Sequence, residues 1–469
     1  MVNLIEMSFN DVVSGRWLDK LYEQWEQGNF GFATLAPVPT GDEKLRNAVG
    51  TMIESNGSYK KGDNVLISAT QTSVAMASET ALVLEETYGI KPVIVMKPFT
   101  TDPKKLFMFM QKFLGEDSDK WDPNSLKELS ANAYQLYNPM RKKGRGHLIV
   151  PFATEEDTPA EFVNAVDVYR TATLKGSSDL EEMAKDGKLI SWDIVMSPTM
   201  SDVIDINQHL PKGEERWTIK TFEDMIYEAI AVPRSELKRY AFEERHDDIE
   251  ILVYASKHGG WVRYRDEDDS DLKFRCYRRP ILLDQGCPGM LSIGGTKNLT
   301  LQITNQPAGE IFVAPIETPT EGKMVFDAPL WTEYGTIQAP YWVYFQKGEV
   351  VAVLAEKESL AALMHITGQR HISGKQLSGY AKMAFERGKR HAEFALGALN
   401  PVLARELKKK RLLPTSKNPL LNEKVGDYHS ATGKDGLFGG LTKDNFHGAA
   451  VEHHDCIRAG KGELKYLGN

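Results

Sequence analysis

The sequence predicts a two-domain protein, with an α/β domain built on a mainly parallel sheet over residues 1–246 and an α+β domain with an antiparallel sheet over residues 247–469. Three observations predict this. The chain has 469 residues, more than one hydrophobic core usually organises. Helical and strand patterns alternate in its first half, whereas short β-prone runs separated by Gly, Asp and Pro dominate the second.

In the first half, apolar runs at residues 65–68 and 92–96 bracket an Ala-rich helical pattern that starts near Thr72. That order predicts a parallel βαβ unit. Further strands are predicted at residues 147–152 and 190–196, and residues 155–188 are typical of helices with polar connections. An open α/β sheet is therefore expected.

Near His246 the pattern changes, and the charged stretch over residues 244–248 suits a domain boundary. The β-prone runs that follow predict an antiparallel region; they cover residues 249–256, 260–265, 272–279, 299–304, 310–316, 323–329 and 341–345. After Lys357 the pattern predicts helices at residues 358–366 and 379–399, before a Gly-rich and His-rich tail.

Composition narrows the function classes. A net charge of -8 argues against nucleic-acid binding, and the short basic clusters at residues 141–145 and 408–411 are expected to be solvated loop or helix ends. No apolar stretch is long enough to cross a membrane. The first residues show no secretory signal, and the sparse Cys276, Cys287 and Cys456 suit a reducing compartment, so we expect a cytoplasmic protein.

Histidines and carboxylates gather in the C-terminal third, where four of the eleven histidines lie between His429 and His454. In an extended strand, His453 and Asp455 point to the same side and can grip one ion. Glu310 follows a Pro-Ala-Gly turn at the head of an apolar strand. A carboxylate there is costly to bury unless it is paired or bound to a cation.

Two more segments extend this cluster. Glu393 is embedded among Ala, Phe, Leu and Gly, while Glu423 and His429 stand on either side of a Gly-Asp turn. The lone His371 and His391 are expected to fill ordinary core or surface roles. The sequence thus predicts a metal site in the C-terminal domain with the ligands Glu310, Glu393, Glu423, His429, His453 and Asp455.

The segments QPAGEIFVAP, AEFALGALNP, LLNEKVGDYHSATG, FGG and EHHD, in this order, resemble the thermophilic-type metalloaminopeptidases, the family of aminopeptidases T and S. The resemblance implies an α/β domain followed by a β-rich domain that holds two divalent ions of zinc, cobalt or manganese, and a homodimer. It matches all six predicted ligands to ligand motifs of the family. The substrate implied is a small molecule or short peptide.

On this interpretation the chain is a hydrolase in which metal-activated water attacks an amide or peptide carbonyl, and Glu310 or Glu393 is the candidate catalytic base. The sequence departs from the family pattern at one position that matters for this hydrolase mechanism. The family commonly carries a Tyr in the turn after the ligand matched by His429, whereas that turn here contains none and Tyr428 precedes the histidine. Loss of such a Tyr bears on how the tetrahedral intermediate is stabilised.

The alternative is a mononuclear non-haem iron(II) dioxygenase that opens the ring of a hydroxylated pyridine or aromatic compound, because the fold also resembles that of 2,5-dihydroxypyridine dioxygenases. Those enzymes have a His where this chain has Glu393 and an apolar residue where it has Glu310. Both positions follow the hydrolase pattern, which favours the hydrolase. A metal-binding protein without catalysis is opposed by the retained carboxylates, which are unstable in a core without a cation.

Overall fold

A computed structural model describes most of the chain, with the ranges 3–98, 102–153, 186–286, 291–294, 302–316, 318–332, 334–371, 388–412, 414–432, 454–458 and 461–468, and a few residues between 162 and 183 and at 385–386. The described chain forms two compact units. Unit 1 comprises Met1–Thr199, Thr300–Ile303 and His447–Ala450, and unit 2 comprises Met200–Leu299, Thr304–Phe446 and Val451–Asn469. The predicted domain boundary between residues 246 and 247 falls inside unit 2 and stays a prediction.

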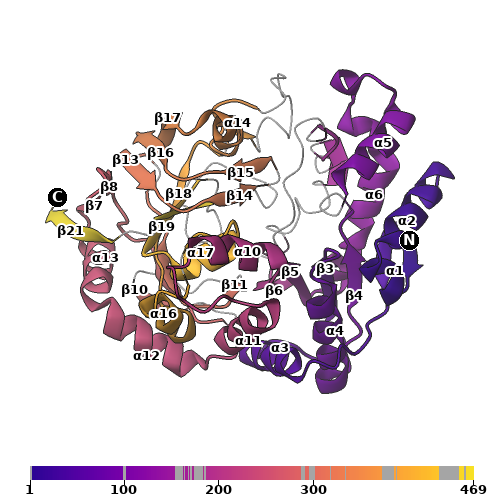
Figure 1. Ribbon diagram of the computed structural model, residues 1–469, viewed down its shortest axis with the longest axis horizontal. Helices are drawn as coiled ribbons and strands as arrows, with labels where there is room; N and C mark the ends of the chain where they lie inside the picture. The colour runs from indigo at the N-terminus through magenta and orange to yellow at the C-terminus, as the bar shows by residue number, and fades with distance from the viewer. Residues whose placement is uncertain are drawn as a thin grey trace. The chain divides into compact units, whose positions relative to one another are not determined.

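Unit 1 contains most of one seven-stranded sheet, including Gln302 and Ile303 of its last strand (Figure 1). In order across the sheet, its strands are β1 (Leu4–Met7), β2 (Phe32–Leu35), β4 (Val93–Met96), β3 (Asn64–Ala69), β5 (Gly146–Phe152), β6 (Leu189–Met196) and β11 (Gln302–Gln306). The pairs β1–β2, β4–β3, β3–β5 and β5–β6 are parallel, and β2–β4 is antiparallel. The sheet is therefore mainly parallel, as predicted.

The helices of unit 1 connect these strands. They are α1 (Phe9–Val13), α2 (Arg16–Glu26), α3 (Glu43–Asn56), α4 (Val74–Tyr88), α5 (Pro103–Leu114), α6 (Lys127–Leu136) and α7 (Asn138–Lys143). Helix α4 joins the parallel strands β3 and β4, which confirms the predicted βαβ unit. Of the predicted helical stretch at residues 155–188, most lies outside the described residues.

A buried polar chain ties the amino ends of three parallel strands together. His147 at the start of β5 lies 3.0 Å from Asp63 through Nε2 and 2.9 Å from Ser191 through Nδ1. The Ser191 hydroxyl donates to Asp193, and the Arg145 guanidinium donates to Asp63. Although Asp, His and Ser form a chain here, Ser191 has no exposed surface, and the amino ends of parallel strands are not where such sheets bind ligands. The chain holds the sheet together.

This network predicts acid-sensitive stability. Burial lowers the pKa of His147 to about 4, against the opposite effect of Asp63. The His147 ring takes up a proton at a higher pH in the unfolded chain than in the folded chain. The free energy of unfolding should therefore fall by up to about 3 kcal/mol as the pH drops from 6.5 to 4. Denaturant unfolding across this range should show that His147→Gln flattens the slope, whereas the exposed His209→Gln should leave it unchanged. An equal slope in wild type and His147→Gln would contradict the assignment.

Unit 2 contains two six-stranded antiparallel sheets. One runs in the order β17 (Glu349–Leu354), β16 (Tyr341–Gln346), β13 (Glu321–Phe326), β8 (Asp271–Phe274), β7 (Trp261–Asp266) and β21 (Gly462–Gly468). The other runs in the order β10 (Leu291–Gly294), β9 (Ile281–Asp284), β12 (Glu310–Val313), β18 (His391–Leu396), β19 (Tyr428–Thr432) and β20 (His454–Arg458). A small hairpin pairs β14 (Leu330–Thr332) with β15 (Gly335–Ile337).

Aromatic side chains fill the space between these two sheets. Phe274 of β8 contacts Phe394 of β18 with ring centres 4.7 Å apart, and Tyr264 of β7 contacts Tyr428 of β19 at the same distance. His391 belongs to this core, since its ring packs on Phe345 and its Nε2 lies 2.8 Å from the Ser430 hydroxyl. The sheets therefore pack as a sandwich, and the sheet that contains β18 has a second face turned away from this core.

The helices of unit 2 are α10 (Met200–His209), α11 (Ile219–Ile230), α12 (Arg234–Glu244), α13 (His246–His258), α14 (Lys357–Ile366), α16 (Pro401–Lys408) and α17 (Pro419–Val425). Helix α14 confirms the helix predicted at residues 358–366. The predicted strand at residues 249–256 is wrong, because this run lies in α13. There Ile249, Leu252 and Ala255 are buried at three-residue spacing, and Asp247 and Asp248 stand in the first turn, where the helix dipole favours negative charge.

Two further predictions differ from the structure. Residues 391–396, predicted as helix, form strand β18, which is buried on both faces and paired on both edges, so its apolar composition gives no alternation to detect. Of the run predicted at residues 299–304, the described residues 302–304 lie in β11, which joins the mainly parallel sheet rather than an antiparallel one.

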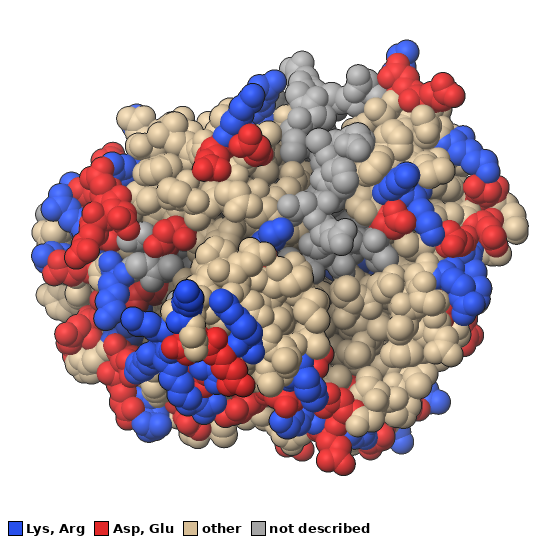
Figure 2. Space-filling view, in the orientation of Figure 1, with Lys and Arg blue, Asp and Glu red and all other residues tan. Residues whose placement is uncertain are grey.

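The basic stretch at residues 408–411 is exposed or half-buried and surrounded by acidic groups of the same unit. Lys408 pairs with Glu244 at 2.9 Å and Lys409 with Glu406 at 3.1 Å. Figure 2 shows blue and red groups intermingled in this region of α12 and α16. These contacts are those of a solvated helix end, as expected from the sequence. None of the helices in the described part of the chain has the length and apolarity to span a membrane.

Candidate metal centre

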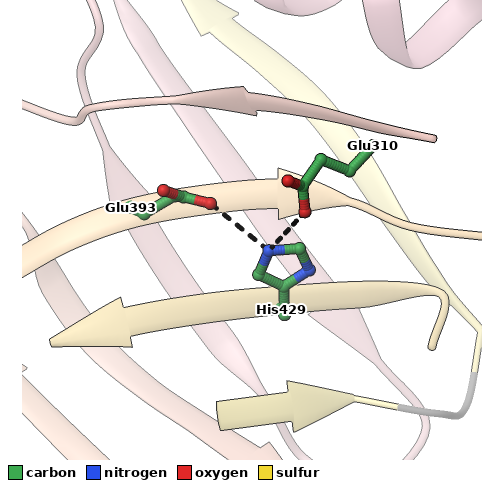
Figure 3. Close-up of side chains that lie close together, drawn as sticks. All are labelled: Glu310, Glu393 and His429. Atoms are coloured by element: carbon green, nitrogen blue, oxygen red, sulfur yellow. Dashed lines mark hydrogen bonds and ion pairs between the residues drawn. The ribbon is translucent and has the colours of Figure 1, made fainter. Parts of the chain in front are cut away.

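Three neighbouring strands bring Glu310, Glu393 and His429 to one place (Figure 3). Glu310 is the first residue of β12, as predicted, and β12 pairs with β18 so that Phe312 lies opposite Ala395. Ala395 in turn lies opposite His429 of β19. Because side chains two residues apart share a face, this register places Glu310, Glu393 and His429 on the same face, away from the aromatic core.

A β-bulge aims Glu393 at this face. In the pairing of β18 with β19, His391 lies opposite Thr432 and Glu393 lies opposite Ala431, so that two steps on β18 match one step on β19. Without the extra residue, His391 and Glu393 would share a face. With it, His391 enters the sandwich core and Glu393 faces His429.

The distances suit an ion bound between the three side chains. His429 Nε2 lies 3.3 Å from Glu393 Oε1 and 3.4 Å from Glu310 Oε2. Ligand atoms about 2.1 Å from a tetrahedral ion are about 3.4 Å apart, whereas charged hydrogen bonds are usually shorter than about 3 Å. All three residues are buried, and their ligand atoms lie within 4.8 Å of one another.

The chemistry of these donors fits a divalent cation. Two carboxylates and one imidazole are ligands that zinc and similar metals accept. Glu310 Oε2 is buried and accepts no hydrogen bond within the described part of the chain. A buried carboxylate oxygen of this kind is costly unless a cation neutralises it.

A close backbone contact fixes the turn before Glu310. Gly309 has φ of +124°, and a Cβ there would lie 2.7 Å from the backbone nitrogen of Asn400. Asn400 anchors the same turn, since its side-chain amide donates to the carbonyl of Ala308 and its carbonyl caps α16. The PAGE and ALNP segments therefore pack together and fix the turn that positions Glu310.

Two charged residues that the sequence analysis missed lie against Glu310. Lys424 of α17 has no exposed side-chain surface, and its Nζ lies 2.7 Å from Glu310 Oε1, 3.3 Å from Glu423 Oε2 and 3.9 Å from Asp284 Oδ2. Asp284 ends β9 directly opposite Glu310. The apolar run ILLD, which stops at a carboxylate, was the signal available for Asp284, while Lys424 had only its place beside Glu423.

Burial and charge shift the pKa values of this pair. Burial raises the pKa of Asp284 to about 7, although Lys424 opposes the shift and Glu310 adds to it. Burial alone would lower the pKa of Lys424, but Glu310, Glu423 and Asp284 together hold that pKa above its ordinary range. The three carboxylates therefore favour the ammonium form of Lys424.

The other predicted ligands are placed less completely. Glu423 lies in α17, where its Oε2 contacts Lys424 and accepts a hydrogen bond of 3.3 Å from Asn305. His453 and the Asp455 side chain lie outside the described residues; only the backbone of Asp455 is described, opposite Ala431. Tyr428 belongs to the other face, where its hydroxyl donates to Asp248. It does not stand in for the Tyr that the turn after His429 lacks.

The sequence also matches a known protein family. The sequence profile described as "Thermophilic metalloprotease (M29)" matches residues 42–368, about seven-tenths of the chain. The chain belongs to this family. Membership implies a metal-dependent peptidase with a divalent metal ion. This agrees with the enzyme class and the divalent metal that the sequence motifs predicted. The matched region contains Glu310 and ends before Glu393.

A solved structure supports the fold. Wild-type AmpT from Thermus thermophilus matches with a TM-score of 0.58 at 16% identity, over 91% of this chain and 96% of that one. A 2,5-dihydroxypyridine dioxygenase from Pseudomonas putida KT2440 gives a TM-score of 0.46 at 11% identity, over 91% of this chain and 95% of that one, a similarity too low to carry an argument. None of the curated proteins matches the sequence.

Proposed function

We propose that this member of the metalloprotease family is an aminopeptidase-like hydrolase that cleaves short peptides, and that Glu310, Glu393 and His429 bind its divalent ion. The observation that carries the proposal is the separation of 3.3 and 3.4 Å between His429 Nε2 and the two carboxylates, which fits a shared ion. His453 and Asp455, expected from the sequence to add ligands, and the predicted homodimer remain parts of the proposal.

The protein side chains have distinct tasks in this proposal. A bound ion would supply Lewis acidity and an activated water. Lys424 holds Glu310 in place, with Nζ 2.7 Å from Glu310 Oε1, while Glu393 Oε1 lies 3.3 Å from His429 Nε2. We therefore favour Glu393 as the group that exchanges a proton with the attacking water, and Glu310 as a fixed ligand.

Metal removal tests the proposal. Chelator-treated protein should lose hydrolysis of short peptides and of aminoacyl anilides, and zinc, cobalt or manganese should restore it with one or two equivalents bound per chain. Elemental analysis of protein purified without added metal gives the count. Full activity in metal-free protein would contradict the proposal.

The same protein sample tests the dioxygenase alternative. The proposed ligands in the described part of the chain are two carboxylates and one His, whereas iron(II) oxygenases typically use two His and one carboxylate. Oxygen uptake with dihydroxylated pyridines or aromatics should therefore be absent. A single iron together with substrate-dependent oxygen uptake would replace the hydrolase with the dioxygenase.

A further inference from the structure

Lys424, one of the two residues that the sequence analysis missed, is fully buried beside the candidate metal centre. Its ammonium group has no solvent contact and lies among the carboxylates of Asp284, Glu310 and Glu423. An unpaired buried ammonium costs several kcal/mol, so the fold retains this lysine only because those carboxylates surround it. The short helix α17 that carries it begins with Pro419 after an Asn418 cap, whose side chain accepts from the backbone N–H of Leu421.

Lys424 engages one oxygen of Glu310 and leaves the other to the metal centre. Nζ lies 2.7 Å from Oε1, while Oε2 of the same carboxylate lies 3.4 Å from His429 Nε2. A carboxylate held at one oxygen loses rotational freedom, and its second oxygen then has a fixed direction. Only Oε2 of Glu310 then remains directed at His429.

Glu423 stands on the far side of the same ammonium. Its Oε2 lies 3.3 Å from Lys424 Nζ and 3.3 Å from the Asn305 amide. Glu423 is not among the described residues whose ligand atoms converge within 4.8 Å, which are Glu310, Glu393 and His429. Asn305 also donates its backbone N–H to Asp284, so that two of the three acidic partners of Lys424, Asp284 and Glu423, share one anchor.

We propose that Lys424 is a positioning residue of the metal centre, which fixes Glu310 as a one-oxygen ligand, and that Glu423 acts by holding Lys424 rather than by binding the ion. This inference rests on the proposed function, because it needs an ion at Glu310, Glu393 and His429. It assigns the E-K pair of the segment LLNEKVGDYH to the support of a ligand rather than to the ligand set.

The test compares ion affinity in two variants of the full chain. Glu423→Gln keeps the shape of the side chain, and by the proposal it keeps the wild-type number of bound ions. Lys424→Met is then added in the Glu423→Gln background. Compared with Lys424→Met alone, this double variant leaves one fewer carboxylate without a cation, and its net charge equals that of wild type. Zinc titration against a competing chelator should show that the double variant binds about 10 to 100 times more weakly than Glu423→Gln, the range for partners that orient a ligand.

Each other outcome has a definite meaning. Electrostatics alone predicts tighter binding in the double variant, since it lacks a positive charge beside the ion, and a purely structural lysine predicts a lower melting temperature with unchanged affinity. Either result overturns the proposal. Loss of ion from Glu423→Gln alone would show that Glu423 is a ligand, and would overturn it too. If wild type binds no ion, the proposed function fails, whereas normal binding in wild type and in both variants removes this inference alone.

Discussion

Glu393→Gln is expected to weaken binding of the divalent ion and to slow peptide hydrolysis by more than about a hundredfold, which is the upper end of what loss of an outer partner costs. The substitution keeps the size and burial of the side chain but replaces a charged oxygen of the proposed site, 3.3 Å from His429 Nε2, with an amide that binds cations more weakly. Isothermal titration with zinc and steady-state hydrolysis of an aminoacyl anilide measure the two effects.

The matched control is Glu321→Gln, a change of the same chemistry at an exposed position of β13 in the same unit. It should leave ion affinity and hydrolysis within about twofold of wild type, because surface substitutions of this kind have small effects. If Glu393→Gln binds zinc as wild type does, Glu393 is not a ligand, and the proposed centre loses one of its three described members.

Gly309→Ala should destabilise unit 2 by about 2–5 kcal/mol and reduce ion binding with it. The residue has φ of +124°, which costs an L side chain about 1–3 kcal/mol, and the new Cβ would lie 2.7 Å from the backbone of Asn400, which cannot move as a flexible side chain can. Denaturant unfolding gives the loss of stability, and zinc titration of the folded fraction gives the effect on Glu310.

Gly335→Ala separates the two causes. Gly335 also has φ of +124°, but a Cβ there meets nothing within 4 Å. The difference between the two variants should be about 1–3 kcal/mol, the cost of the steric overlap alone. Equal losses would show that the close approach to Asn400 is unimportant, and with it the link between the PAGE and ALNP segments.

The sequence predicted elements where a local signal agreed with the tertiary structure. The unit β3–α4–β4 carries two apolar runs and a helix between polar turns, and each boundary is marked in the sequence. Strand β18 and helix α13 were missed for opposite reasons. The composition of β18 suits a helix, and pairing with β12 and β19 overrides it, whereas the β-branched and aromatic residues of α13 concealed a helical period.

The candidate site was predicted only in part. Chemistry and motif order singled out Glu310, Glu393 and His429, which strand register then brings together. Lys424 and Asp284 escaped because their importance comes from partners that are distant in sequence: Asp284 meets Glu310 across a strand pair, and Lys424 meets it from a helix more than a hundred residues later. A charge inside a core has no sequence signature until its neighbours are known.

The bulge in β18 has a consequence for how such centres evolve and are found. Because Ala392 is an extra residue in the pairing, the alternation of side chains shifts by one residue between His391 and Glu393. His391 therefore points into the sandwich core, whereas Glu393 points to the opposite face of the sheet. Substitutions around His391 can repack the core without rotating Glu393. A search that assumes strict alternation would assign His391 to the same face as Glu393, and so would select the wrong imidazole as the partner of the carboxylate.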